Sequence, residues 1–170
     1  FGSVFIDGVR YTTKNAEVFI DGELSDEKDL NLGDFITLLA SAEDESGEIA
    51  AQVIYAESAV RGPISEIDAK SGALKVLGQT IVVGRETFFG EGVVGQDAFN
   101  VGDIVDVRGP SSTNGGVIAT RIYPAQERKS SLPGIIQSLN AVNSQFLLSG
   151  ITVDYSSASE WPGELSNGLS

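Results

Sequence analysis

Short segments in which apolar and polar residues alternate run along the whole chain, and clusters of Gly, Asn, Asp and Ser separate them. This pattern is typical of β-strands joined by turns, and it predicts small sheets or barrels. The middle of the chain shows it most clearly. We expect five strands there, at residues 62–68, 74–76, 80–83, 104–108 and 117–123.

The segments between these strands carry the residues that turns require. Asn114 and Gly115 form the strongest short turn signal in the chain and predict a hairpin before residue 117. Residues 90–95 are rich in glycine and predict a loop. The continuous apolar run Ile81, Val82 and Val83 predicts a strand that is buried on both faces. Residues 25–30 are polar and brief, so a single helical turn is the most that they predict.

The same pattern is written along the chain three times. An alternating strand that ends in glycine occurs at Gly8, Gly78 and Gly150, at offsets of 78 − 8 = 70 and 150 − 78 = 72. A second, unrelated block agrees, because the motif Asn-x-Gly-Asp at residues 31–34 returns at residues 100–103, an offset of 69. Two blocks that share one period indicate duplicated modules.

The period predicts an all-β chain of tandem, small, five-stranded antiparallel barrels. The strand pattern fits a partly open Greek-key barrel similar to the oligonucleotide/oligosaccharide-binding (OB) fold, and a small β-sandwich is the alternative. We expect module 1 at residues 1–61, module 2 at residues 62–128 and module 3 at residues 129–170. Module 1 lacks an upstream first strand and module 3 lacks the last two, so only module 2 is complete.

Composition removes several classes of chemistry. The chain has no Cys, His or Met, so it can form no disulfide, Cys/His zinc site, Ser-His-Asp triad or haem ligated by those residues. We therefore expect no enzyme and no cofactor. The absence of easily oxidised sulfur would suit an extracellular protein. The chain begins at Phe1 without a basic and apolar leader, which predicts either a processed chain or a fragment.

The charge balance is strongly acidic, with 24 Asp and Glu against 11 Lys and Arg, a net charge of −13. Such a surface repels phosphate backbones, so we expect no binding to nucleic acid. It also keeps exposed strand edges from associating, which is the plainer explanation. No apolar run approaches the length of a membrane span.

At several of these motifs the sequence resembles a bacterial family of tandem domains of unknown function, the family numbered 5666. The resemblance rests on residues 1–11, residues 75–81, and the pair of segments 101–103 and 119–122. It covers about the first 125 residues well and the remainder loosely. In module 3, residues 160–163 depart from the family pattern, where module 2 has residues 88–91.

The resemblance implies a repeat module of exported proteins, often lipid-anchored or displayed at the surface. It carries over no catalytic or binding residue. We therefore expect a location in the cell envelope or outside the cell.

Two acidic runs are candidate calcium sites, since calcium prefers several oxygen ligands. They are residues 43–48 and the carboxylates between Asp21 and Asp29. Their spacing matches no known calcium loop, so a solvated turn is the better interpretation of each. Carboxylate pairs of a glycosidase would need a deep groove, which a small filled barrel does not offer.

Two further candidates lie near the end of the chain. Trp161 with Tyr155 could form a stacking platform for a sugar ring, although alignment with Phe89 and Val83 favours core packing. The basic cluster of Arg121, Arg128 and Lys129 predicts salt bridges at the link between modules 2 and 3.

The sequence thus predicts a non-enzymatic structural or adhesive module of the bacterial envelope or exterior. Because modules 1 and 3 are incomplete, we expect copies of the chain to associate head to tail, with a strand of one copy completing the sheet of the next in a filament. The alternative is a module that binds carbohydrate or another ligand.

Overall fold

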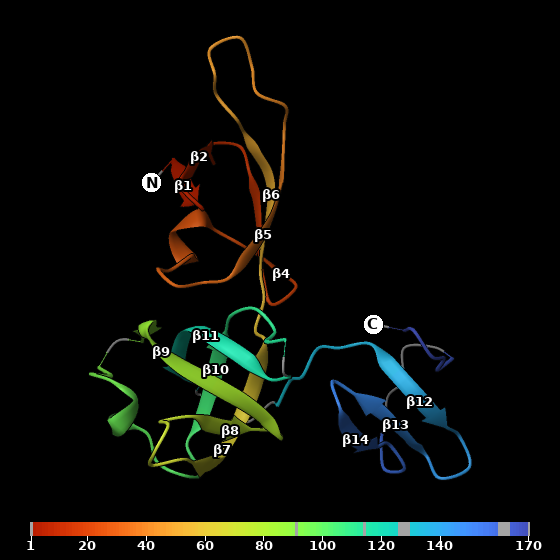
Figure 1. The fold of residues 1–170 in the computed structure, drawn as a ribbon. Helices are drawn as coiled ribbons and strands as arrows, with labels where there is room; N and C mark the ends of the chain where they lie inside the picture. Colours follow the sequence, from red (N-terminus) through yellow and green to blue (C-terminus); the bar gives the residue numbers. More distant parts are fainter. Residues whose placement is uncertain (1, 91, 114, 126–129, 160–163, 170) are drawn as a thin grey trace.

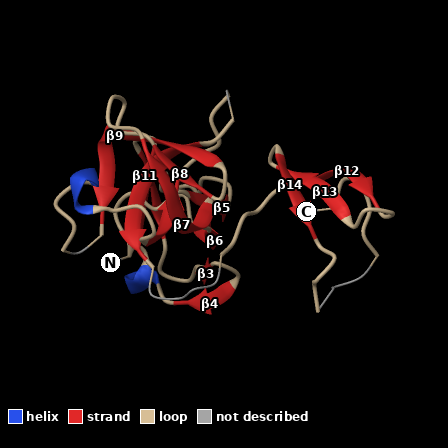
Figure 2. Cartoon of the chain, turned by 90° about the horizontal axis from the view of Figure 1, so that it is seen from below, coloured by secondary structure: helices blue, strands red, loops and turns tan. Residues whose placement is uncertain are grey.

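The computed structural model describes residues 2–90, 92–113, 115–125, 130–159 and 164–169. The described chain is built of β-strands and two single 3₁₀ turns, which confirms the all-β class (Figures 1 and 2). Three bodies follow one another: an N-terminal part up to residue 56, a closed barrel at residues 60–124, and a C-terminal sheet at residues 136–154. The C-terminal sheet lies to one side of the barrel in both views.

The strands agree closely with the sequence pattern in the middle of the chain and less closely elsewhere. The N-terminal part holds β1 (Ser3–Ile6), β2 (Val9–Thr12), β3 (Glu17–Ile20), β4 (Glu23–Ser25), the 3₁₀ turn η1 (Glu27–Asp29), β5 (Ile36–Ala40) and β6 (Ala51–Ala56). The barrel holds β7 (Val60–Ile67), β8 (Leu74–Val76), β9 (Gln79–Phe89), the 3₁₀ turn η2 (Gln96–Ala98), β10 (Ile104–Arg108) and β11 (Val117–Pro124). The C-terminal sheet holds β12 (Ile136–Asn140), β13 (Gln145–Leu148) and β14 (Ile151–Asp154).

The barrel closes in the order β7-β8-β9-β11-β10, with β10 paired back to β7. Four of the five pairs are antiparallel, and β9 and β11 are parallel, which corrects the expectation of an antiparallel barrel. The reason is one of parity. Strand direction cannot alternate around a closed ring with an odd number of members, so at least one neighbouring pair must be parallel.

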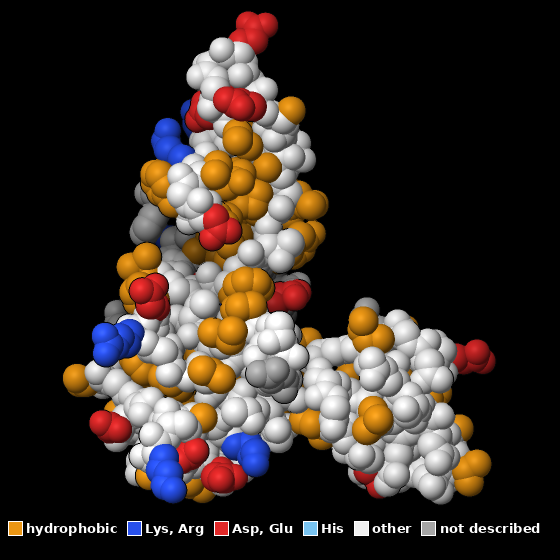
Figure 3. All heavy atoms as spheres, viewed as in Figure 1, with side chains coloured by type: hydrophobic (Ala, Val, Ile, Leu, Met, Phe, Trp, Pro, Cys, Tyr) orange, Lys and Arg blue, Asp and Glu red, His pale blue; other side chains and the backbone are white. Residues whose placement is uncertain are grey.

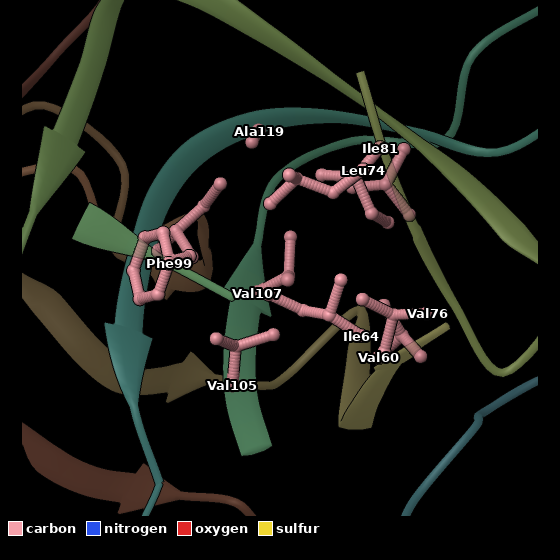
Figure 4. Close-up of a cluster of buried hydrophobic side chains, with 11 residues drawn as sticks. Val60, Ile64, Leu74, Val76, Ile81, Phe99, Val105, Val107 and Ala119 are labelled. Atoms are coloured by element: carbon pink, nitrogen blue, oxygen red, sulfur yellow. The ribbon is translucent and has the colours of Figure 1, made fainter. Parts of the chain in front are cut away.

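The main core fills this barrel (Figure 4). Its buried members are Val60, Ile64, Leu74, Val76, Ile81, Phe99, Val105, Val107, Val117, Ala119 and Ile122. Val82 is 45% exposed between the buried Ile81 and the half-buried Val83, so the expected burial of this strand on both faces is wrong. The outside of β9 faces solvent there, because no second layer covers it.

The N-terminal part repeats most of the barrel's pairings. β1 and β2 form an antiparallel hairpin like β8 and β9, and β5 pairs with β6 like β10 with β11. Thr12 bridges Ala50 in parallel, at the positions equivalent to Val82 and Ile118 in the β9 and β11 pair. Within the described residues, no strand takes the place that β7 has in the barrel.

The C-terminal sheet has three antiparallel strands in the order β12-β13-β14. Only two of its apolar side chains, Ile136 and Phe146, are buried, each at 7% exposure. Gln79 Nε2 donates a hydrogen bond to the Ser149 carbonyl at 2.9 Å, and Arg61 bridges Ser131. These contacts join the small sheet to the barrel.

Candidate functional site: an open strand position in the N-terminal part

Besides the outer edge of β4, the N-terminal part has two strand edges without a strand partner among the described residues. β1 pairs only with β2, and β5 pairs only with β6. The equivalent barrel strands, β8 and β10, each have a second partner, and for both it is β7. The N-terminal part therefore has an open position that one extended strand would fill.

Four apolar side chains show the effect of this missing strand. Val4, Ile6, Ile36 and Leu38 are only partly buried. Their barrel equivalents at offsets of 70 and 69 are Leu74, Val76, Val105 and Val107, with exposures of 1%, 0%, 0% and 0%. The sequence places core residues at all eight positions, and burial is incomplete only where the first strand is missing.

A groove of about 340 Å³ lies at the open position. Its walls come from β1, η1, the loop after η1 and the start of β5, with Val4, Leu30 and Ile36 among the lining side chains. Phe5 and Leu32 at its rim are 70% and 78% exposed. Hydrophobic side chains gather on this face of the N-terminal part (Figure 3). An exposed apolar groove between two free strand edges is suited to binding an extended peptide.

Glu27 holds one end of the groove in shape. Its Oε1 accepts hydrogen bonds from the Gly2 amide at 2.9 Å and from the Thr13 hydroxyl at 2.6 Å. Asp34 also lines the groove, and its Oδ2 accepts a hydrogen bond from the Asn31 amide at 2.8 Å. The contacts of Glu27 tie η1 to the start of the chain, so this end of the groove has its shape before any strand enters.

A buried cluster of charges attaches the N-terminal part to the barrel. Asp21 forms ion pairs with Arg61 and Arg108, the latter at 3.1 Å. Asp106, which is fully buried, also pairs with Arg61 and accepts a hydrogen bond from the Ser58 hydroxyl at 2.7 Å. We call these five residues the charged latch. Asp21 comes from the turn between β3 and β4, Ser58 from the linker, and the other three from β7 and β10, so their contacts fix the N-terminal part against the barrel.

Asp21 is the member of the latch that the N-terminal part supplies. Burial raises the pKa of its carboxyl, but the hydrogen bonds from Ser58 and the charges of Arg108 and Arg61 outweigh burial and hold the pKa below its ordinary value of 3.8. Asp21 is therefore ionised at neutral pH. The expectation that this acidic loop is simply a solvated turn is wrong for Asp21, because the loop's neighbour is a pair of arginines from the barrel.

A second ion pair lies beside the latch. Arg121 Nη1 donates to Asp34 Oδ1 at 2.9 Å, and its guanidinium lies 4.7 Å from the centre of the Tyr123 ring. The expected salt bridge of Arg121 at the link between modules 2 and 3 is wrong, because this side chain on β11 pairs with Asp34 of the N-terminal part. Arg128 and Lys129 lie outside the described residues.

The latch also contains two unsatisfied polar atoms. Asp106 Oδ1 and Arg108 Nη1 are buried and have no hydrogen-bond partner within the part of the chain that the structure describes. Sequence reasoning missed the latch, since its ion pairs join residues 40 to 87 positions apart. The signal that could have indicated a buried ion pair was the occurrence of Asp106 and Arg108 in an otherwise apolar strand.

The aromatic candidate is only partly described. Trp161 lies outside the described residues. The Tyr155 ring stacks on Phe146 with 5.7 Å between ring centres. Tyr155 therefore contributes to the small core of the C-terminal sheet, which agrees with the packing interpretation.

The acidic run at residues 43–48 forms the turn between β5 and β6. Asp44 Oδ1 accepts hydrogen bonds from the Ser46 amide at 2.8 Å and from the Glu48 amide at 2.9 Å. Among the residues that the structure describes, no three acidic side chains are grouped so that they could hold a metal ion. Nor does the described part of the chain contain a helix of the length and apolarity that crossing a membrane requires.

Comparison with known proteins identifies one part of the chain. Residues 61–123 match the model of a family described as a domain of unknown function (DUF5666). The matched segment corresponds to the barrel almost strand for strand. No curated protein matches the chain. No solved structure matches it.

Proposed function

We propose that the chain, whose residues 61–123 match the DUF5666 model, is a non-enzymatic structural or adhesive module of the bacterial cell envelope or exterior. The chain carries no Cys, His or Met, and so lacks the side chains of many catalytic sites. The family resemblance of the N-terminal motifs supports export.

We further propose that the chain is a tandem array of OB-like modules. The barrel order β7-β8-β9-β11-β10, with one parallel pair between its third and fifth strands, is compatible with the five-stranded Greek-key barrel of that fold. The N-terminal part has the pairings of the second to fifth strands, and the C-terminal sheet has those of the first three. These pairings support the interpretation of both as incomplete copies.

One observation carries the functional proposal: the open position between β1 and β5, with four core side chains left partly exposed. A strand from another copy of the chain would pair with both edges and bury these side chains. The contact would be heterologous, since donor and acceptor surfaces differ, and it would propagate head to tail into a filament. Buried apolar area and main-chain hydrogen bonds would supply its free energy.

Sedimentation velocity over a wide concentration range, with electron microscopy of the same samples, tests the proposal. We expect species larger than the monomer that grow with protein concentration, and linear particles in the images. Monomers alone across the whole range would refute assembly.

Carbohydrate binding by Trp161 and Tyr155 stays a prediction. It would appear as binding on a glycan array that Trp161→Ala abolishes while the far-ultraviolet circular dichroism is unchanged. The stacking of Tyr155 on Phe146 gives it little support, since a residue that packs within a core presents less surface to a sugar.

A further inference from the structure

We propose that the strand entering the open position is residues 132–139 of a second copy, in the register that β7 has in the barrel. The inference rests on the proposed function and names its donor. It follows from the repeat, because residues 132–139 align with Val60–Ile67 of β7 at an offset of 72. Gly62, Ile64 and Ile67 become Gly134, Ile136 and Leu139.

The pairings of β7 fix the register of the incoming strand. In the barrel, Ile64 lies opposite Val76, Ile67 opposite Leu74, Gly62 opposite Val105 and Val60 opposite Val107. Transferred by the same offsets, the donor residues meet the partly buried side chains of the open position. Ile136 then lies opposite Ile6, Leu139 opposite Val4, Gly134 opposite Ile36 and Leu132 opposite Leu38.

A glycine in the donor leaves room for the side chain of the turn that follows the acceptor strand. A Cβ on Gly62 would lie 2.8 Å from Leu77 Cγ, and one on Gly134 would lie 2.6 Å from Ser149 Oγ. Leu77 and Ser149 occupy the same place in their hairpins and have φ of 45° and 50°. Asp7, with φ of 49°, is their counterpart after β1. The open position thus favours a strand that has glycine beside Asp7. In residues 132–139 that glycine is Gly134.

Charge also favours this donor. Residues 130–153 contain no charged side chain in a chain of net charge −13. The groove has two carboxylates in its walls, that of Glu27 and that of Asp34, which is paired with Arg121. An uncharged strand brings no further negative charge to these walls, whereas β7 carries Glu66. Uncharged β-prone segments associate readily when exposed.

The donor strand has no second strand partner in its own copy among the described residues. On the edge away from β13, β12 bonds to the last described residues: the Ile136 amide donates to the Leu169 carbonyl and the Gly168 amide to the Ile136 carbonyl, both at 2.8 Å, and the Leu139 amide donates to Asn167 Oδ1 at 2.9 Å. Two main-chain hydrogen bonds between Arg61 and Ser131 tether the chain to its own barrel just before the donor strand. Its sheet buries only two apolar side chains. In the open position it would gain a strand partner on each edge and a larger core, so exchange between copies is a low-cost route to assembly.

Disulfide trapping tests the donor and its register, since the native chain has no cysteine. The barrel pair Glu66 and Lys75 corresponds to Ser138 of the donor and Phe5 of the acceptor, and both are exposed. We would mix two size-tagged variants, Phe5→Cys and Ser138→Cys, under mild oxidation. The matched control replaces Phe5→Cys by Leu24→Cys, whose side chain is 71% exposed on the edge strand β4.

We expect the Phe5 and Ser138 pair to form a mixed disulfide at least about tenfold faster than the control pair, because strand pairing raises the local thiol concentration. Equal rates in samples that do assemble would overturn the donor assignment and leave the proposed function standing. Chains that remain monomeric would overturn both.

A peptide experiment on the unmodified protein keeps the test independent of whether the variants fold. A synthetic peptide of residues 132–140 should raise the thermal unfolding midpoint of the chain and inhibit its assembly. The same peptide carrying Gly134→Val should do neither, because its side chain would clash at the turn after β1. Equal effects of the two peptides would contradict the selection of glycine.

Discussion

Asp106 is the residue on which the charged latch depends. It is fully buried in β10, and Arg61, Arg108 and Ser58 surround its carboxylate. Burying an ion pair contributes little net stability, but removing one partner leaves the other charge buried without compensation. The latch therefore determines how the N-terminal part joins the barrel more than it adds to the stability of either.

Asp106→Ala should lower the free energy of unfolding by about 3–5 kcal/mol, because Arg61 and Arg108 lose the buried carboxylate that they share and keep only the partly exposed Asp21. Urea denaturation followed by circular dichroism measures this loss. The matched control is Glu66→Ala on the neighbouring β7, whose pair with Lys75 is exposed, and it should leave the midpoint unchanged. Similar midpoints for the two variants would mean that the latch does not hold the structure.

Asp21 makes the attachment of the N-terminal part sensitive to acid. The pKa of its carboxyl is lower in the folded chain than the ordinary 3.8, so its contribution is complete above that value and is lost as the pH falls through the folded pKa. Stability should therefore decline below about pH 4. Asp21→Asn should decline less steeply over the same interval in denaturation curves recorded at a series of pH values. Parallel curves for the two proteins would show that Asp21 contributes nothing to the acid response.

At the scale of elements, the hairpin of β10 and β11 depends on a glycine at its start. Gly109 has φ of 148°, and a Cβ there would lie 2.0 Å from the Ile118 carbonyl oxygen. Gly84, within β9, has open space at the same position and no positive φ. Replacing each of these two glycines by alanine thus distinguishes two effects. At Gly109 the added methyl group meets the backbone of β11, whereas at Gly84 it only reduces the flexibility of the unfolded chain.

Gly109→Ala should destabilise the barrel by more than about 2 kcal/mol, since the backbone of β11 must move to admit the methyl group. Gly84→Ala should be neutral or stabilise by up to about 1 kcal/mol, because it restricts only the unfolded chain. Thermal unfolding by calorimetry gives both values. A loss at Gly84 as large as that at Gly109 would contradict the structure at this hairpin.

The alternating pattern was sufficient to predict most strands, because inward and outward positions of a strand differ in polarity. The strand at 104–108 was predicted with the bounds it has, and β9 was predicted too short, since its charged centre at Arg85 and Glu86 concealed a strand that continues on the barrel's outside. The parallel pair of β9 and β11 could not be read from local pattern. It follows only from closure of an odd ring.

The open strand position could be predicted from the sequence, but the ion pairs beside it could not. The missing first strand of module 1 was visible as a gap in the repeat, and partial burial of Val4 and Leu38 is its structural counterpart. The contacts of Asp21 and Arg121 were not predictable, because they depend on how two bodies are placed against each other. No period or motif encodes that placement.

At the scale of the whole molecule, the chain combines a closed barrel with an N-terminal part that has two unpaired strand edges and a C-terminal sheet whose first two strands are uncharged. In the proposed filament, the closed barrel, which has no free edge, would separate the acceptor from the donor. Donor and acceptor differ, which favours a chain of copies over a closed dimer. Assembly of the proposed filament therefore depends on whether the position between β1 and β5 accepts one further strand.

A self-complemented chain tests that claim. Because β1 and β8 are 70 residues apart, a copy of residues 60–70 placed directly before Phe1 puts a β7-like strand in register with β1 and β5. The control carries the same extension with its copies of Ile64 and Ile67 changed to Asp, which would prevent its burial.

The decisive measurement is sedimentation velocity of the unmodified, self-complemented and control chains at equal concentrations. We expect assemblies of the unmodified and control chains and monomers of the self-complemented chain, since the open position of the latter is already filled. Assembly of the self-complemented chain to the same extent as the unmodified one, or monomers in all three samples, would contradict this expectation.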